Sequence, residues 1–435
     1  MQENKDTTNE TAGQKIFRPP KMKYCTKCVY PASSAIPLAF NEEGVCSGCI
    51  VHEQKMKIDW SKQEEKLKKL VEPYRSNSNY DCIIPVSGGK DSYFQTWYVT
   101  QVLKMKPLLV TYQGNDYYEE GLRNLKKMRE VFNVDHLIMN PSVEVLKHLH
   151  KKCYKMMGDM SWHNHCGIYS FPVQVAVKFK VPLIIWGEHG YTDQGGMFRM
   201  NDCIEMTRKN RTEHACRGYD WDDMVDPNLN LREKDLLNHR YPTDEELEEN
   251  GIRGIFIGFY VFWDANQHTK KMIDLYNFET LPFPLERTYR RMSAIDDMHE
   301  SGIHDYLKFI KFGSGRGSDH SCKDIRLGCM TREEGIVNIK KYDAVKSYRD
   351  LNRWLKYVDM TEEEFDYIAD TFRNPRVWWI QDGEWYKDNI WGEPSSYGKV
   401  LLSEKEQEKY YWNDTKKGIG RGPISEVSVS HGKKN

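Results

Sequence analysis

The sequence lacks long apolar runs and an excess of charge of either sign. Its most apolar stretches, residues 181–186 and 255–263, are far shorter than the ~20 residues that a bilayer-spanning helix needs, and its first residues are polar. The 63 basic residues nearly balance the 64 acidic ones, which excludes a global field that would attract nucleic acid or an anionic membrane. We expect a soluble, cytoplasmic protein that binds no nucleic acid.

Cysteine is also sparse, with 11 residues among 435, too few for a disulfide framework. The odd count and two C-x-x-C pairs indicate metal ligands and free thiols in a reducing compartment. Two such pairs can surround one ion as a tetrahedron of thiolates, which is the closed arrangement of structural zinc. The sequence therefore predicts a zinc site, with an iron–sulfur cluster, a redox pair or unrelated thiols as alternatives; its ligands are Cys25, Cys28, Cys46 and Cys49.

Residues 44–48, Gly-Val-Cys-Ser-Gly, also fit the G-x-C-x-G nucleophile elbow of class I glutaminases. Such an elbow lies on a central strand of a large α/β domain, and too little chain precedes Cys46. No His-x-Glu pair follows to accept a proton, and the chain starts with Met1-Gln2 rather than with a nucleophile. If the protein uses ammonia, we expect another protein to make it.

A strand followed by a glycine-rich loop and a helix start is expected near residue 87. The β-branched run 82–86 stops at Ser87-Gly88-Gly89, and a helical pattern starts at Asp91. Two glycines let backbone N–H groups point inward, and the helix N-terminus adds about half a positive charge. The loop predicts a phosphate site, with a tight turn as the alternative; its residues are Ser87, Gly88, Gly89, Lys90, Asp91 and Ser92.

Strands alternate with helices after this loop, which predicts an α/β fold with a parallel, doubly wound sheet. The ligand is then expected beyond the carboxyl ends of the strands, at the loop and at the turn 187–190. Glu188 in this turn is a candidate to hold Mg²⁺ with Asp91, although both carboxylates suit helix caps or loops as well. The expected strands are 107–112, 135–139 and 181–186, and the expected helices 117–132, 142–157, 168–180 and 268–276.

Two further segments carry polar groups of chemical interest. Residues 162–166, Trp-His-Asn-His-Cys, invite a second metal site, but without a partner motif we interpret them as core or surface residues. Residues 313–317 alternate three glycines with Ser314 and Arg316, which predicts a flexible, donor-rich loop. Arg316 and Arg326 could clamp a carboxylate or phosphate there, with surface salt bridges as the alternative.

These features divide the chain into segments. The stretch 220–250 is acidic and is expected to be a charged insertion with a solvated face. Capping boxes at Thr331 and Thr361 predict accessory helices, and four tryptophans, at 378, 379, 385 and 391, predict a small core. The expected parts are a tail at 1–20, a zinc module at 21–60, the nucleotide domain at 61–330, a helical subdomain at 331–413 and a tail at 414–435.

Two resemblances refine this interpretation. The Ser-Gly-Gly-Lys-Asp-Ser loop at 87–92 resembles the PP-loop of ATP pyrophosphatases, which implies a sheet of the adenine nucleotide alpha-hydrolase (HUP) type. With the cysteine pairs followed by Tyr30-Pro31, the strand end at 182–188 and the segment 315–335, residues 22–390 resemble the N-acetyl sugar amidotransferases of bacterial surface-glycan synthesis. That group includes the O-antigen and pseudaminic acid enzymes.

The resemblance implies conversion of an acetamido group on a nucleotide-sugar or nonulosonic acid to an acetamidino group, in lipopolysaccharide O-antigen or nonulosonic acid synthesis. ATP with Mg²⁺ would transfer AMP to the amide oxygen, and ammonia would then displace the AMP. The implied catalytic residues are Lys90, Asp91 and Glu188, and zinc would be structural. The implied partners are a glutaminase and a cyclase-like channel protein, similar to the two subunits of imidazole glycerol phosphate synthase.

Two alternatives remain open at this stage. A zinc-containing PP-loop tRNA thiolase would adenylate a carbonyl in the same way and transfer sulfur, for which Cys322 and Cys329 are candidates, but the balanced charge and the lack of a basic tract disfavour it. A zinc-stabilised nucleotide-binding scaffold without enzymatic activity is the other.

Overall fold

The computed structural model describes residues 16–36, 38–293 and 296–410, so the predicted tails lie outside it except for residues 16–20. Five parallel strands form one sheet in the order β3-β2-β1-β4-β5. The predicted doubly wound sheet is thereby confirmed, and β2 and β4 are buried along their whole length because helices cover both faces. The strands are β1 (Cys82–Pro85), β2 (Pro107–Tyr112), β3 (Asp135–Met139), β4 (Leu183–Trp186) and β5 (Arg253–Phe256).

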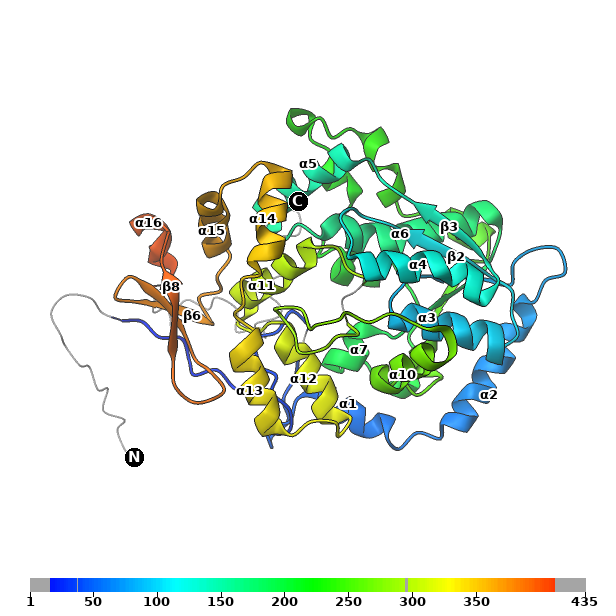
Figure 1. The fold of residues 1–435 in the computed structure, drawn as a ribbon, viewed down its shortest axis with the longest axis horizontal. Coiled ribbons are helices and arrows are strands. Elements are labelled where there is room, and N and C mark those ends of the chain that lie inside the picture. Colours follow the sequence, from blue (N-terminus) through cyan, green and yellow to red (C-terminus); the bar gives the residue numbers. More distant parts are fainter. Residues whose placement is uncertain (1–15, 37, 294–295, 411–435) are drawn as a thin grey trace.

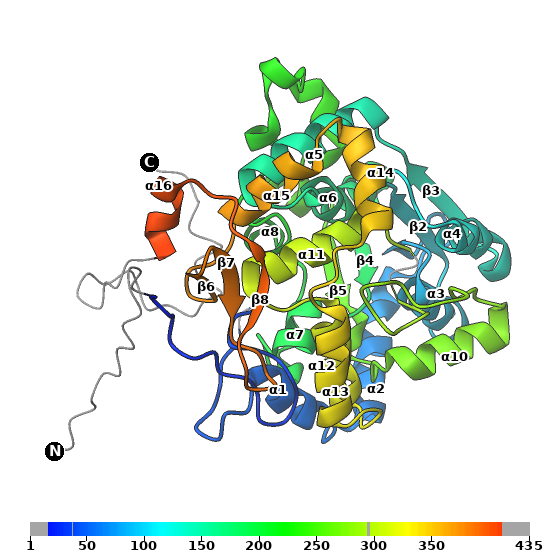
Figure 2. The same cartoon turned by 60° about the vertical axis from the view of Figure 1, so that its left-hand side comes forward.

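Helices pack against both faces of the sheet (Figures 1 and 2). One group, α3 (Lys90–Trp97), α4 (Glu119–Phe132) and α10 (Ala265–Tyr276), lies on one face, and α5 (Val143–Met157) and α6 (Trp162–Phe179) lie on the other. The predicted helix 168–180 corresponds to α6, which starts earlier, at Trp162. In the described ranges, every helix falls short of the length or the apolar character that a bilayer span requires.

The N-terminal segment and the insertion both contribute to the protein core. Two helices, α1 (Ser47–Lys55) and α2 (Trp60–Val71), follow the cysteine pairs, whose side chains share one apolar cluster with Cys322 and Ile339. The stretch 220–250 forms short helical turns and α9 (Asp244–Glu249). Acidic side chains such as Asp222, Glu233 and Asp244 are exposed, as a solvated face requires. Its Met224, Leu231 and Leu236 are instead fully buried against α5 and α6, so the stretch also adds to the core.

The C-terminal region is helical, as predicted, and then adds a small sheet. Both capping boxes are present, at Thr331 and Thr361. Three of the four tryptophans, at 378, 379 and 385, are buried around an antiparallel sheet that the sequence did not predict. The elements are α11 (Glu300–Phe312), α12 (Arg316–Arg326), α13 (Arg332–Tyr342), α14 (Tyr348–Val358), α15 (Glu362–Thr371), β6 (Trp378–Gln381), β7 (Glu384–Lys387), β8 (Ser395–Lys399) and α16 (Glu404–Gln407).

The prediction of a flexible, donor-rich loop at 313–317 is wrong. Gly313 ends α11 in the left-handed region with φ +75°, and Arg316 already starts α12. Gly317 lies inside α12, where a Cβ atom would come within 2.8 Å of the Asp343 carboxylate. The glycines therefore end one helix and let the next pack closely, rather than make the segment flexible.

Candidate functional site

The loop 86–89 joins the end of β1 to the start of α3, at the point where the order of the sheet reverses. The Ser87 N–H donates to Ser92 Oγ at 2.9 Å, and the two serine hydroxyls lie 3.1 Å apart. Gly88 has φ +88°, and a Cβ atom there would lie 2.7 Å from Leu125 Cβ of α4. Only glycine fits this turn, which directs donors outward at a helix N-terminus as a phosphate site requires.

Asp296 lies directly against this loop, and sequence reasoning missed it. Ser87 Oγ donates to Asp296 Oδ2 at 2.5 Å, and any side chain at Gly89 would collide with the same carboxylate. One donor of the loop, the Ser87 hydroxyl, is therefore already paired with a carboxylate of the protein itself. Asp296 is separated from Ser87 by 209 positions, and no sequence signal connects them.

Two predicted catalytic residues, Lys90 and Asp91, lie in the first turn of α3. Lys90 Nζ lies 2.6 Å from Asp91 Oδ2, whereas Asp91 Oδ1 is buried without a hydrogen-bond partner among the described residues. Burial opposes ionisation of Asp91, but the positive charges of Lys90 and Lys323 hold its pKa below the usual value. The carboxylate is therefore charged, with one oxygen available for a further ligand.

Glu188, the third predicted catalytic residue, follows β4 and faces α12. Lys323 Nζ of α12 lies 2.8 Å from Glu188 Oε1 and 3.2 Å from Asp193 Oδ2. Lys55 Nζ contacts the other oxygen of Asp193 at 3.1 Å. Burial raises the pKa of Glu188, although the nearby Lys323 counteracts this.

These oxygens suit Mg²⁺ chemically, because Mg²⁺ prefers carboxylates and keeps several waters. In the described structure, however, Lys323 supplies the positive charge beside Glu188, and no close group of carboxylates forms around Asp91. Among the described residues, Asp91 Oδ1 is buried and has no hydrogen-bond partner. A magnesium ligand role for Asp91 and Glu188 stays a prediction.

The four cysteines of the predicted zinc site meet in one buried group, with all sulfur atoms within 4.8 Å of one another. Cys28 Sγ lies 3.6 Å from Cys46 Sγ, and the N–H groups of Cys28 and Cys46 point at Cys25 Sγ. Four converging thiols fit a metal with a closed tetrahedral shell. Thiolates also hold iron–sulfur clusters, so the identity of the metal stays a prediction.

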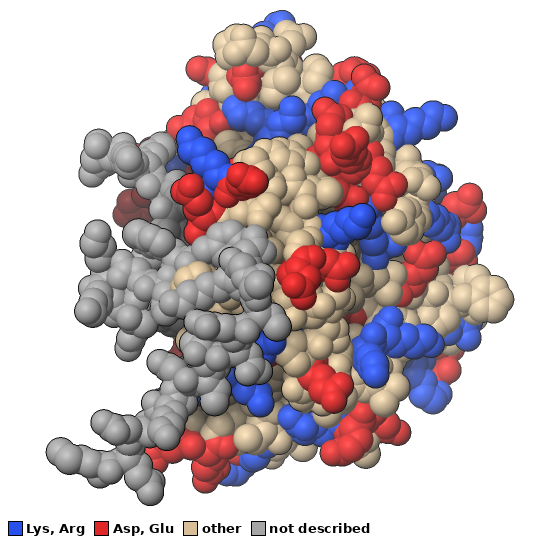
Figure 3. All heavy atoms as spheres, turned by 90° about the vertical axis from the view of Figure 1, so that its left-hand side faces the viewer, with Lys and Arg blue, Asp and Glu red and all other residues tan. Residues whose placement is uncertain are grey.

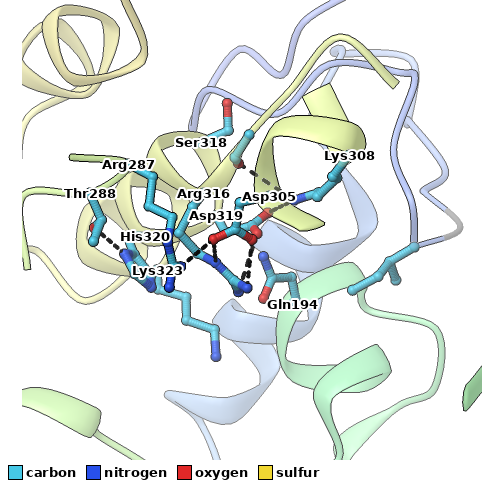
Figure 4. A network of polar contacts seen from close by, with 12 residues as sticks. Gln194, Arg287, Thr288, Asp305, Lys308, Arg316, Ser318, Asp319, His320 and Lys323 are labelled. Atoms are coloured by element: carbon cyan, nitrogen blue, oxygen red, sulfur yellow. Dashed lines mark hydrogen bonds and ion pairs between the residues drawn. The ribbon is translucent and has the colours of Figure 1, made fainter. Parts of the chain in front are cut away.

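Both arginines of the predicted clamp have partners within the protein. Arg326 donates to the carbonyls of Asp193 and Gln194 and lies 3.6 Å from Cys46 Sγ. Arg316 Nη2 lies 2.7 Å from Asp305 Oδ1 in a polar network (Figure 4), which also contains Arg287, Lys308 and Asp319. The Arg316 contact is the ion pair of the alternative interpretation, whereas Arg326 makes hydrogen bonds to carbonyls instead. A substrate contact by either arginine stays a prediction.

A second group of metal-type ligands is present, but it is not the one at 162–166. His163 joins His150 of α5 and Glu300 of α11, all buried. His165 instead packs edge-on against His304, and Cys166 Sγ contacts Arg211. His163, His165 and Cys166 point in different directions because residues 162–166 form the start of helix α6 rather than a loop.

Comparison with known proteins supports part of the resemblance. Residues 285–389, from before α11 to β7, match the family model of the LPS biosynthesis protein WbpG-like C-terminal domain. A curated relative, Uncharacterized protein MJ1599 from Methanocaldococcus jannaschii, is 26% identical over 121 residues. That alignment covers 27% of this chain and 42% of the relative.

Solved structures show distant similarity. The U34-tRNA thiolase NcsA from Methanococcus maripaludis, solved with its [4Fe-4S] cluster, has 15% identity and a TM-score of 0.28 over 71% of this chain and 86% of its own. The NH3-dependent NAD synthetase from Campylobacter jejuni has 13% identity and a TM-score of 0.25, over 49% and 95%. NMN synthetase from Francisella tularensis has 10% identity and a TM-score of 0.26, over 52% and 99%. Scores this low carry no argument about function, and the matched C-terminal segment remains the informative similarity.

Proposed function

We propose that the protein is an ATP-dependent amidotransferase that converts an acetamido group on a bacterial surface-glycan sugar to an acetamidino group. One observation carries the proposal: Lys323, from the segment that matches the WbpG-like domain, reaches the phosphate-loop end of the sheet and contacts Glu188. This contact supports the proposal because it brings the segment with that similarity to the glycine-rich loop's end of the sheet.

The loop would bind the two terminal phosphates of ATP through the N–H groups of residues 88 and 89 and the hydroxyls of Ser87 and Ser92. Lys90 and Lys323 would offset the negative charge that develops between the α and β phosphates. Mg²⁺, held by the free oxygen of Asp91, would supply further charge neutralisation. The amide oxygen attacks the α phosphorus, and pyrophosphate leaves with the electron pair of the broken P–O bond.

The resulting imidate carries AMP as a good leaving group, which an amide oxygen alone is not. Ammonia forms a C–N bond, the C–O bond to AMP breaks, and one proton is released. A partner glutaminase, with a cyclase-like channel protein, would supply the ammonia. The cysteine group would fix the N-terminal segment against α12, from which both Lys323 and Arg326 project.

The test is incubation of the protein with ATP, Mg²⁺, ammonium and a panel of acetamido sugars. We expect a product one mass unit lighter than its sugar, because NH replaces O, formed together with AMP and pyrophosphate. Ser87→Ala and Lys90→Ala should lose the product while they retain the wild-type melting temperature. Formation of ADP, or no turnover with any sugar, would contradict the proposal.

A tRNA thiolase remains the second candidate because the four-cysteine group would also suit an iron–sulfur cluster. Two observations weigh against it. The two cysteines considered for sulfur transfer are not both accessible, because Cys322 is buried beside the cysteine group whereas Cys329 is exposed. Where the described residues form the face in Figure 3, Lys and Arg are interspersed with Asp and Glu and make no basic stripe. Sulfur incorporation into tRNA by the pure protein would favour this candidate instead.

A further inference from the structure

A cavity of about 370 Å³ opens beyond the carboxyl end of β2, and none of the residues predicted from the sequence lines it. Its volume suits a small ligand. Four segments line it: the turn after β2 with Asn115 and Asp116, α5 with His150, the start of α11 with Glu300, and α14 with Arg353, Lys356 and Tyr357. Two of these segments, α11 and α14, belong to the region that matches the WbpG-like domain.

The cavity is close to the phosphate loop. β2 pairs directly with β1, so the turns after the two strands are neighbours. The segment 296–300 connects the two places, because Asp296 touches Ser87 and Glu300 lines the cavity. Four residues reach at most about 14 Å, which limits the separation of their Cα atoms to that span. A ligand of monosaccharide size in the cavity could therefore present a substituent to a nucleotide on the loop.

The floor of the cavity carries a proton acceptor. Glu300 is 4% exposed, and its Oε1 has no hydrogen-bond partner among the described residues. This oxygen lies 3.6 Å from Nε2 of both His150 and His163. Burial raises the pKa of Glu300 to about 7, a value suited to proton transfer near neutral pH.

A metal fits this floor poorly. The Trp354 indole N–H donates to His150 Nδ1 at 3.1 Å, so neutral His150 carries its proton on Nε2. That proton points at His163 Nε2, 2.8 Å away, and His163 Nδ1 in turn faces the Tyr112 hydroxyl. A metal would need a free Nε2 on both histidines and would leave two N–H groups facing each other at Trp354. The arrangement instead forms a chain along which a proton can be shared.

The cavity lining carries charges of both signs, and one of its cations has no acidic partner among the described residues. Asp350 pairs with His299 at 2.8 Å. Arg353 Nε donates to Asp116 Oδ2 at 3.0 Å and is neutralised by it. Lys356 is exposed, and no acidic side chain in the described ranges pairs with it. A ligand with a negatively charged group would complement this lysine, while Tyr357 and Trp354 provide aromatic surface beside it.

We propose that this cavity binds the sugar acceptor, that Lys356 favours acceptors carrying a negative charge, and that Glu300 takes the proton released when ammonia attacks. The inference rests on the proposed function. In the step, the ammonia nitrogen bonds to the imidate carbon, the C–O bond breaks with its electron pair going to AMP, and one N–H proton moves to the Glu300 carboxylate.

Binding tests the first half of the proposal independently of turnover. The probes are two matched pairs: N-acetylneuraminic acid with its methyl ester, and N-acetylglucosaminuronic acid with N-acetylglucosamine. By calorimetry or ligand-observed NMR, we expect an acid to bind the full-length protein about two- to fivefold more tightly than its neutral match. Lys356→Met should remove this preference, and Lys270→Met, an exposed change on α10, should keep it. Equal binding within both pairs, or an unchanged preference in Lys356→Met, overturns the proposal.

Kinetics test the second half. With the acceptor sugar, Glu300→Gln should release pyrophosphate in the first turnover within twofold of wild type, but form the amidino product at least about 100-fold more slowly. Two outcomes would overturn the role of Glu300. One is that Glu300→Gln slows both steps equally. The other is that Glu300→Gln loses a metal ion that the wild type holds in addition to the metal expected at the four cysteines. If wild type makes no AMP with any sugar, the proposed function fails, whereas an acid preference that depends on Lys356 would still support the binding site.

Discussion

Lys323 Nζ lies 2.8 Å from Glu188 Oε1, across 135 positions of sequence. This contact joins α12 to the carboxyl end of β4, where the phosphate loop also lies. α12 belongs to the segment that matches the WbpG-like domain, so that segment contacts the phosphate-loop end of the sheet. The proposed nucleotide site therefore depends on the docking of α12.

Lys323→Met should weaken ATP use and destabilise the fold. Glu188 and Asp193 would lose their shared cation, and leaving partly buried carboxylates without it costs about 1–3 kcal/mol. We expect KM for ATP to rise about tenfold and the urea midpoint to fall. Lys323→Arg, which keeps the charge, is the control and should stay closer to wild type in both measurements. An unchanged KM in Lys323→Met would remove this lysine from the nucleotide site.

Asp296→Asn should tighten binding of inorganic pyrophosphate in the absence of Mg²⁺. The Asp296 carboxylate occupies a donor of the loop and repels phosphate, and the amide keeps its shape without the charge. An effect of about 1 kcal/mol corresponds to roughly fivefold in affinity by calorimetry. Repeating the titration with Mg²⁺ provides the contrast: if Asp296 instead helps to hold the ion, the substitution should weaken binding only in that titration.

We expect Cys25→Ser to abolish metal binding at the four cysteines and to lower stability by several kcal/mol, because a metal held there would tie the N-terminal segment to α12. Elemental analysis should find about one zinc per chain in wild type and little in the variant. Cys203→Ser, a half-buried cysteine outside the group, is the matched control and should keep the metal. Iron and sulfide with visible absorbance would identify a cluster in place of zinc.

Glu300 should make the folded protein less stable as pH rises. Burial raises its folded pKa to about 7 from the ordinary value of 4.5. Between these values the folded state holds a proton that the unfolded state has lost, so this contribution to stability is full below pH 4.5 and is lost as pH rises through 7. Glu300→Gln should therefore gain about 3 kcal/mol relative to wild type between pH 5 and 8.

The denaturant midpoints of wild type and Glu300→Gln, each determined at pH 5 and at pH 8, measure this difference in stability. The buried neighbours His150 and His163 add a pH dependence of their own, because burial lowers the pKa of each to about 3. Between pH 5 and 8 they therefore take up protons only in the unfolded state. They are present in both proteins, so the comparison cancels most of their contribution. A difference between the two proteins that stays constant with pH would show that Glu300 ionises normally.

The strands, the phosphate loop and the cysteine pairs follow from the sequence itself. Short apolar runs predicted β2 and β3 to the residue, because the local apolar pattern and the residues that flank it decide where a strand starts and stops. Two C-x-x-C pairs can meet in few ways, so Cys25, Cys28, Cys46 and Cys49 converge as expected. The prediction of a flexible loop at 313–317 was wrong because glycines that permit close helix packing look the same in a sequence as glycines that make a loop flexible.

Tertiary structure alone decided which distant groups complete the site. Asp296 reaches Ser87, Lys323 reaches Glu188, and Glu300 reaches His150, each across more than 100 positions. No periodicity or motif encodes such pairs, since they depend on how α11 and α12 dock on the edge of the sheet. The sequence by itself determined the glycine-rich turn after β1 and the two cysteine pairs, and packing decided which charged side chains face that turn and where the cavity beside β2 lies.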